Sequence, residues 1–150
     1  MKIATICYCI RGDEILLGMK KKDFGAGKWN GFGGKVKDDE TIRAAAIREV
    51  EEEAGLRVPD DALEQAADIV FSFADAPMFH CHAFRATAWE GVPRESDEMR
   101  PQWFRIDDLP YESMWESDQY WLPQALSGEM VKAVCRFDPA GEKVEKFEFV

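Results

Sequence analysis

Three glutamates, Glu49, Glu52 and Glu53, lie close together in the chain and could jointly bind a metal ion. On a helix with about 100° per residue, Glu49 and Glu53 project within about 40° of each other, and Glu52 lies about 60° to the other side of Glu49. Two alanines and a valine form the adjoining apolar stripe. The three carboxylates are therefore expected along the edge of the buried face.

Carboxylates at these spacings repel one another by a few tenths of a kcal/mol per pair, and partial burial would increase that cost. A hard divalent cation such as Mg²⁺ would offset it, because Mg²⁺ takes oxygen ligands and leaves positions for water and substrate phosphates. Arg48 can pair with Glu52 one turn on. A solvated acidic helix face is thus the alternative interpretation for any single glutamate here.

The helix that must position these carboxylates is expected from about Glu40 to Ala54. Asp38 and Asp39 are good N-cap residues and place negative charge at the positive end of the helix. Three consecutive alanines, starting at Ala44, favour helix, and Gly55 suits the left-handed position just past a helix end.

A glycine-rich loop precedes the helix, and residues 23–34 contain five of the 11 glycines of the chain. Such density permits positive φ angles and close approach of the backbone to a ligand, so that amides can hold phosphate oxygens. Asn30 lies among apolar and glycine residues, where it could either stabilise a turn or read the edge of a base. Lys20 is close to this loop, at the end of an expected strand.

The totals favour one globular domain spanning residues 1–150. Hydrophobic residues make up 46% of the chain, and the net charge is −10. Strong negative charge disfavours polymeric nucleic acid and anionic membranes as partners, and no apolar run is long enough to span a bilayer. The N-terminus lacks a signal-peptide pattern, which favours the cytoplasm. The four cysteines have no zinc-type spacing and are expected to be reduced core residues.

Further along, the pattern predicts a loop over residues 57–67, a helix near 117–126, and a series of strands. His80 and His82 share one face of a strand and could bind a metal ion, but the sequence offers no evident third ligand, so half-buried or surface histidines are expected. Strands and two helices in this order indicate an α+β fold with a mixed sheet between helices. The strands are expected at residues 3–10, 14–19, 68–73, 79–89, 102–106, 131–137 and 144–150.

The spacing of the residues around the glutamates resembles the Nudix box without a mismatch. The matching positions are Gly34, Glu40, Arg48-Glu49-Val50, Glu52-Glu53 and Gly55-Leu56. A match of this length is highly specific. The resemblance implies an α/β/α sandwich and a loop–helix–loop that binds Mg²⁺, with Mn²⁺ as a possible substitute, and hydrolyses a nucleoside diphosphate linked to another moiety.

The likeness extends over nearly the whole chain to one branch of that family, the oxidised purine nucleoside triphosphatases, which act on nucleotides of the 8-oxo-dGTP type. It weakens in residues 57–67 and after Leu126. The matching segments are residues 17–21, 24–36, 95–101, 103–104, 114–115 and 120–121. The resemblance therefore implies hydrolysis of a modified purine nucleoside triphosphate to the monophosphate and pyrophosphate, which sanitises the nucleotide pool, by a protein expected to be a monomer.

The resemblance also implies roles for individual residues. Glu49, Glu52, Glu53 and Glu98 would carry metal and catalysis, with the Gly33 carbonyl as a further metal ligand. Asn30 and Asp118 would read the purine edge, Trp115 would stack on the base, and Lys20 would lie near the phosphate or sugar. The other residues expected to contact substrate are Thr5, Phe24, Phe32, Gly34, Lys35, Phe71, Phe73 and Ser117.

Two positions depart from the branch. Two adjacent aspartates that recognise the base are replaced here by Ser117-Asp118, and an aromatic residue is replaced by Ala4. A carboxyl pair can share a proton, whereas a serine offers a hydroxyl that donates and accepts, so the preferred modified base stays open. The alternatives are another nucleotide substrate, such as an unmodified dNTP, a methylated purine triphosphate or a capped nucleotide, and a nucleotide-binding module without hydrolysis.

Overall fold

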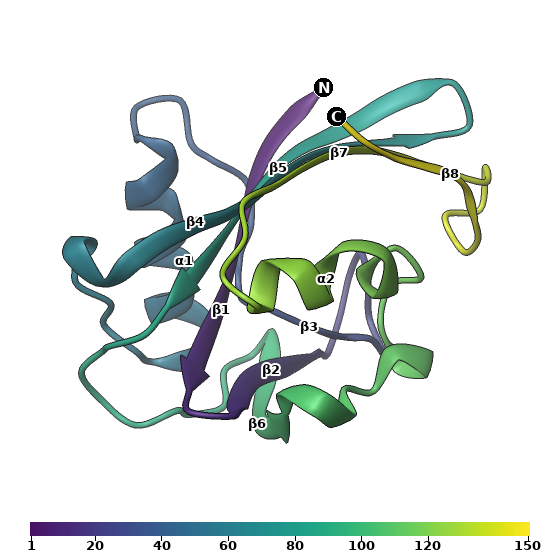
Figure 1. The fold of residues 1–150 in the computed structure, drawn as a ribbon. Helices are drawn as coiled ribbons and strands as arrows, with labels where there is room; N and C mark the ends of the chain where they lie inside the picture. Colours follow the sequence, from purple (N-terminus) through teal and green to yellow (C-terminus); the bar gives the residue numbers. More distant parts are fainter.

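A mixed β-sheet lies between two helices in the computed structural model, which describes residues 1–150 (Figure 1). Figure 1 shows α1 and α2 on opposite faces of the sheet, so the predicted α+β sandwich is confirmed. No helix is long and apolar enough to cross a membrane. The helices are α1 (Ile42–Ala54) and α2 (Asp118–Leu126), and the strands are β1 (Lys2–Arg11), β2 (Glu14–Lys20), β3 (Trp29–Asn30), β4 (Leu63–Phe73), β5 (Ala76–Ala86), β6 (Met99–Arg105), β7 (Val131–Phe137) and β8 (Val144–Phe149).

The sheet runs in the order β3-β2-β1-β5-β4-β7-β8, with β6 paired to β2. The β1·β5 and β4·β7 pairs are parallel and the other pairs are antiparallel. The predicted hairpin of β1 and β2 is confirmed, and both tail strands lie within one residue of their predicted bounds. The parallel pairs place β1, β4 and β5 at the centre, between the two helices.

Each helix covers its own apolar core. Val50 and Ala46 of α1 pack with Cys7, Cys9 and Phe32 on one face of the sheet. On the other face, α2 packs against a second cluster that includes residues of β1, β2, β4 and β7. All four cysteines are free thiols, and three of them are buried, as the sequence predicts.

Helix α1 begins two residues later than predicted, and its N-cap is Thr41 rather than Asp38 or Asp39. Thr41 has extended backbone angles, and its side chain accepts a hydrogen bond from the Ala44 amide at 3.1 Å. Glu40 instead stays outside the helix, because its carboxylate accepts from the Lys37 amide at 2.9 Å. The predicted end is confirmed, since Gly55 is left-handed with φ 74°.

The prediction of a loop over residues 57–67 is wrong at its C-terminal end. A 3₁₀ turn at Asp60–Ala62 leads directly into β4, which begins at Leu63, five residues earlier than expected. The pairing with β5 shifts register between Gln65 and Ala67, and this irregularity breaks the alternation on which the prediction depended. The partner strand β5 is also displaced and spans Ala76–Ala86.

Replacing Gly33 with Ala is expected to destabilise the fold by about 1–3 kcal/mol, the usual cost of overpacking. A Cβ at Gly33 would lie 1.8 Å from the carbonyl oxygen of Thr5, and backbone atoms cannot move aside as a side chain can. The free energy of unfolding in urea measures the loss. Gly12→Asn is the control, since nothing lies within 4 Å of that position and Asn tolerates its left-handed backbone. Equal stability of Gly33→Ala and the wild type would contradict the prediction.

Candidate active site

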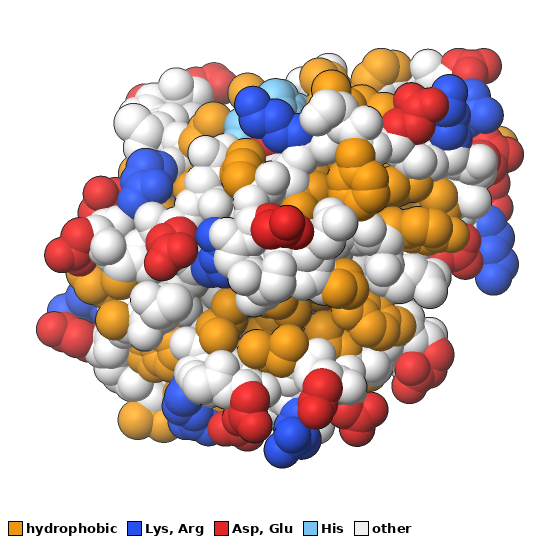
Figure 2. All heavy atoms as spheres, in the orientation of Figure 1, with side chains coloured by type: hydrophobic (Ala, Val, Ile, Leu, Met, Phe, Trp, Pro, Cys, Tyr) orange, Lys and Arg blue, Asp and Glu red, His pale blue; other side chains and the backbone are white.

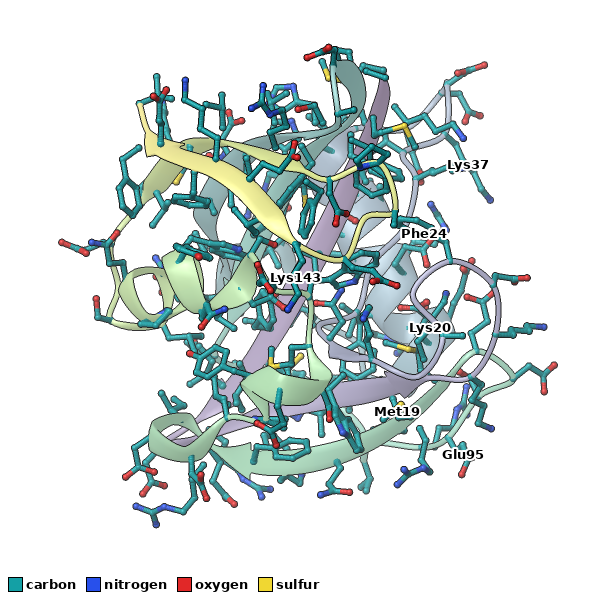
Figure 3. All side chains as sticks on the ribbon, turned by 90° about the vertical axis from the view of Figure 1, so that its right-hand side faces the viewer. Met19, Lys20, Phe24, Lys37, Glu95 and Lys143 are labelled. Atoms are coloured by element: carbon teal, nitrogen blue, oxygen red, sulfur yellow. The ribbon has the colours of Figure 1, made fainter.

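A cavity of about 820 Å³ opens between β1, β4 and β5 of the sheet, the glycine-rich loop, α1 and the start of α2. Figure 3 views the molecule from a side on which Lys20, Phe24 and Lys37, three of the lining residues, are seen together. Carboxylates and glycines line one end of the cavity, and aromatic side chains with a few buried polar groups line the other. The two ends suit different parts of one ligand.

The four glutamates predicted to act in chemistry all line the polar end of the cavity. Glu53 is only 4% exposed, and its carboxylate accepts a hydrogen bond from the Gly33 amide at 2.9 Å. Burial, helped by the negative charge of Glu49, raises the pKa of Glu53 to about 8. Burial also raises the pKa of Glu49. In both cases the main cause is burial, which disfavours the charged form of a carboxyl group.

Arg48 joins several of the glutamates at this end of the cavity. Its guanidinium donates to Glu40 at 2.6 Å, to Glu49 at 2.8 Å and to Glu52 at 3.2 Å. A planar guanidinium with several donors can fix several carboxylates at once. This network extends the Arg48–Glu52 pair expected from the sequence and gives Glu40 a positioning role. Hydrogen bonding to Arg48 lowers the pKa of Glu40 to about 2.

The residues at the polar end fit a divalent metal ion. Glu53 has a single backbone donor for a nearly buried carboxylate, and Glu98 approaches from β6's N-terminal side with Lys20 Nζ 3.3 Å from its Oε2. Oxygen ligands on converging side chains with uncompensated charge are what a hard cation requires. A Cβ at Gly34 would lie 2.6 Å from a carboxylate oxygen of Glu49, so a side chain there would displace that carboxylate.

Aromatic rings form the opposite wall. Phe24, which is 55% exposed, lies over the cavity with its ring centroid 5.1 Å from that of Trp115 and 6.0 Å from that of Phe73. Phe71 lines the same wall. Rings at such separations contact one another and form a continuous apolar wall on which a planar ligand can stack.

Buried polar groups lie beside the aromatic wall. Asp118 Oδ2 and Thr5 Oγ1 are fully buried and have no hydrogen-bond partner. Buried polar atoms in native proteins are nearly always hydrogen-bonded, so a bound ligand is a natural partner for them. Ser117 is 1% exposed. The Asn30 side-chain oxygen accepts from the Gly31 amide at 2.9 Å and from the Tyr8 hydroxyl at 3.4 Å, which leaves its NH₂ group as a donor. These groups could recognise the edge of a base.

The stability of the metal-free protein is expected to fall as pH rises from about 5 to 8, in part because of Asp118. Burial raises its pKa from the usual 3.8 to about 7, so the folded state retains a proton that the unfolded state loses. The resulting stabilisation is complete below pH 4 and is lost as pH rises through 7. Urea unfolding at both pH values should show a smaller loss for Asp118→Asn than for the wild type. Equal losses would contradict this assignment.

Of the predicted site residues, only Phe32 lies away from the cavity, because its ring is fully buried in the core beneath α1. Its packing in this core anchors the glycine-rich loop. Ala4, which departs from the branch, lines the cavity. Lining residues that the sequence reasoning missed include Tyr8, Phe79, Cys81, Trp121 and Phe137. The register of β4 with β5 pairs Phe79 with Phe71, so correct strand pairing could have revealed Phe79 and Cys81.

Comparison with known proteins agrees with this geometry. A family model described as the NUDIX domain matches residues 1–125. The chain is 51% identical to the oxidized purine nucleoside triphosphate hydrolase of Danio rerio over 91% of this chain and 86% of that protein. It is 46% identical to the protein of the same name from Mus musculus, over 83% and 80% of the two chains.

A solved structure supports the fold independently. The MutT protein from Bacillus halodurans superposes with a TM-score of 0.85, covering 99% of this chain and 97% of that one, at 22% identity. The Nudix-box residues Gly34, Arg48, Glu49, Glu52 and Glu53 line the polar end of the cavity, and Glu40 is joined to them through Arg48. The chain belongs to the Nudix family and is a Nudix hydrolase.

Proposed function

We propose that this protein hydrolyses oxidised purine nucleoside triphosphates to the monophosphate and pyrophosphate, and so removes damaged nucleotides from the pool. The identity of 51% and 46% to two oxidized purine nucleoside triphosphate hydrolases supports this substrate class. The observation that carries the proposal is the buried Asp118 carboxyl, which has an oxygen without a partner at the apolar end of a cavity whose other end holds four glutamates.

Nudix hydrolases use divalent metal ions generally, and we propose Mg²⁺ for this one. Glu49, Glu52, Glu53 and Glu98 would hold the ion, with the Gly33 carbonyl as a further ligand, because hard oxygen donors suit Mg²⁺. When bound, the ion would neutralise phosphate charge and favour formation of the attacking water's conjugate base. Mn²⁺ accepts the same donors and could substitute.

In the reaction, the oxygen of water forms a bond to the β-phosphorus while the bond from that phosphorus to the α,β-bridging oxygen breaks. The bridging oxygen leaves on the nucleoside monophosphate, and pyrophosphate is the other product. A glutamate accepts the proton of the water. Glu53 is the better placed candidate, since the Gly33 amide fixes its carboxylate, whereas Glu98 is paired with Lys20. Lys20 would face the phosphates or the sugar.

At the apolar end, Trp115 and Phe24 would stack on the base, and Phe71 and Phe73 would complete the aromatic wall. Asp118 would form a hydrogen bond with the edge of the base. With a pKa of about 7, its carboxyl can donate when protonated and accept when ionised. The NH₂ group of Asn30 would supply a further donor. Thr5, Gly34, Lys35 and Ser117 would complete the contacts with the nucleotide.

Pyrophosphate release from 8-oxo-dGTP and from dGTP, measured side by side at low substrate concentration with Mg²⁺, tests the proposal. A preference of at least tenfold for the oxidised nucleotide, about 1.4 kcal/mol in transition-state binding, is expected, and EDTA should abolish both activities. Equal rates would keep the Nudix chemistry and refute the assigned substrate class. The panel would then extend to adenine-based, methylated and capped nucleotides.

The same reasoning leads us to propose a monomeric, cytoplasmic enzyme in which residues 1–150 act as one domain. A single sheet joins strands from both ends of the chain. The net charge of −10 disfavours binding of polymeric nucleic acid or anionic membranes, so the partner is a small nucleotide whose charge is neutralised by metal ions.

A further inference from the structure

Both histidines of the chain lie on β5 and form one cluster with an aspartate on β4. The antiparallel register pairs Asp68 with His82 and Val70 with His80, which brings Asp68, His80 and His82 to the same face of the sheet. Residues that alternate with them, such as Phe71 in β4 and Phe79 and Cys81 in β5, face the other way and line the cavity. The cluster therefore lies on the opposite face of the strands that form the aromatic wall.

We propose that Asp68, His80 and His82 form a second metal site, for a borderline dication of the Zn²⁺ class. Their ligand atoms all lie within 4.8 Å of one another. His80 Nε2 is 2.5 Å from Asp68 Oδ1, and the two imidazole rings are 4.4 Å apart between centroids. Ligands bound tetrahedrally to zinc at about 2.0–2.1 Å are separated by about 3.4 Å. Small side-chain rotations would bring all three ligands to that spacing.

The donor set selects the metal. Two imidazole nitrogens and one carboxylate oxygen suit Zn²⁺ and its borderline neighbours, whereas Mg²⁺ prefers oxygen ligands alone. The site thus differs in chemistry from the glutamate cluster, and it does not depend on the proposed function.

Access to the site is open. The side chains of His80 and Asp68 are each 30% exposed, and Figure 2 shows histidine atoms reaching the molecular surface. Three protein ligands would leave a fourth position for water or an external ligand. A hydrogen bond between His80 and Asp68 explains the placement of those two residues but not that of His82. Asp68 is the third ligand that was not evident from the sequence for the two histidines.

A bound metal ion would cross-link the paired strands β4 and β5. The site lies next to β1, where Thr5 pairs with His82 in the parallel register. Because metal that binds only the folded state stabilises it by mass action, Zn²⁺ should raise the melting temperature. The same strands carry the aromatic wall of the cavity, so the wall would be held more firmly in the metal-bound protein.

Calorimetric titration with Zn²⁺ in the presence of saturating Mg²⁺, which occupies the oxygen ligands of the glutamate site, tests the proposal. One equivalent should bind, and His80→Gln and His82→Gln should each weaken binding at least tenfold. Lys132→Ala is the matched control, because Lys132 lies beside Asp68 in β7 on this face and provides no ligand. Cys81→Ser, which removes the one thiol that is not fully buried, should also bind normally.

Nitrogen-15 NMR of the histidine side chains in the wild type provides a second measurement that requires no variant to fold. Since the chain has only two histidines, every imidazole signal reports on this cluster, and one equivalent of Zn²⁺ should shift both sets in proportion to occupancy. Unshifted imidazole signals, or histidine variants that bind Zn²⁺ as tightly as the wild type, would overturn the proposal.

Discussion

Replacing Glu53 with Gln is expected to lower turnover by about 10²- to 10⁴-fold, the usual contribution of a positioned acid–base group. The amide cannot accept a proton and is a poor ligand for a hard cation, so the loss follows whether Glu53 acts as base or as metal ligand. The fold should persist, because Gln has the shape of the protonated carboxyl and can still accept the hydrogen bond that the Gly33 amide donates at 2.9 Å. Pyrophosphate release and urea unfolding, measured on the same sample, separate the two effects.

Glu51→Gln is the matched control for this experiment. Glu51 lies on the same helix but outside the cavity, and its carboxylate pairs with Arg57 at 3.3 Å on the surface. Its replacement should leave turnover within about twofold, since exposed pairs contribute little. Glu98→Gln tests whether Glu98, in the loop before β6, is the proton acceptor instead. A larger loss of turnover for Glu98→Gln than for Glu53→Gln would assign the general base to Glu98. Near-full activity of Glu53→Gln would refute the assignment.

The sequence predicted the helix of the glutamates and the loop before it because their signals are local. Glycine density, alanine runs and the stop at Gly55 act within a few residues. The start of α1 was misplaced because Asp38, Asp39 and Thr41 are all plausible N-caps, and tertiary contacts decided among them. Besides the bond from the Lys37 amide, the Glu40 carboxylate accepts a hydrogen bond from Arg48 at 2.6 Å, an interaction across eight residues that no propensity contains.

The non-local features of the site could not be read in the same way. Phe79 and Cys81 enter the cavity only through the register of β4 with β5, and that register contains irregularities at Gln65/Ala67 and Phe71/Ser72. A shift of one residue moves every side chain to the other face, so the wall of the cavity depends on irregularities that the sequence does not reveal. The same register supplies Asp68 as the third member of the histidine cluster. Long-range pairing is thus the information that was lacking.

Replacing Asp118 with Ala is expected to lower kcat/KM for 8-oxo-dGTP by about 10- to 100-fold, or about 1.4–2.8 kcal/mol, which is typical for loss of a hydrogen bond to a charged or ionisable group. Its Oδ2 and the neighbouring indole Nε1 of Trp121 are both buried without a hydrogen bond and belong to residues that line the cavity, so a bound base could use them. Ser117→Ala should cost less than tenfold, because a hydroxyl contributes a neutral hydrogen bond. Steady-state kinetics with 8-oxo-dGTP and dGTP measure both variants.

Gln119→Ala is the control for this pair, since Gln119 follows Asp118 on α2 but is exposed and lies outside the cavity. Its kinetics should match the wild type. The selectivity carries the argument: if Asp118 reads the oxidised edge, Asp118→Ala must lose more activity toward 8-oxo-dGTP than toward dGTP. An equal loss on both nucleotides would mean that Asp118 supports the shape of the pocket. Recognition of the oxidised base would then fall to other polar groups that line the cavity, such as the NH₂ group of Asn30 and the unpaired indole Nε1 of Trp121.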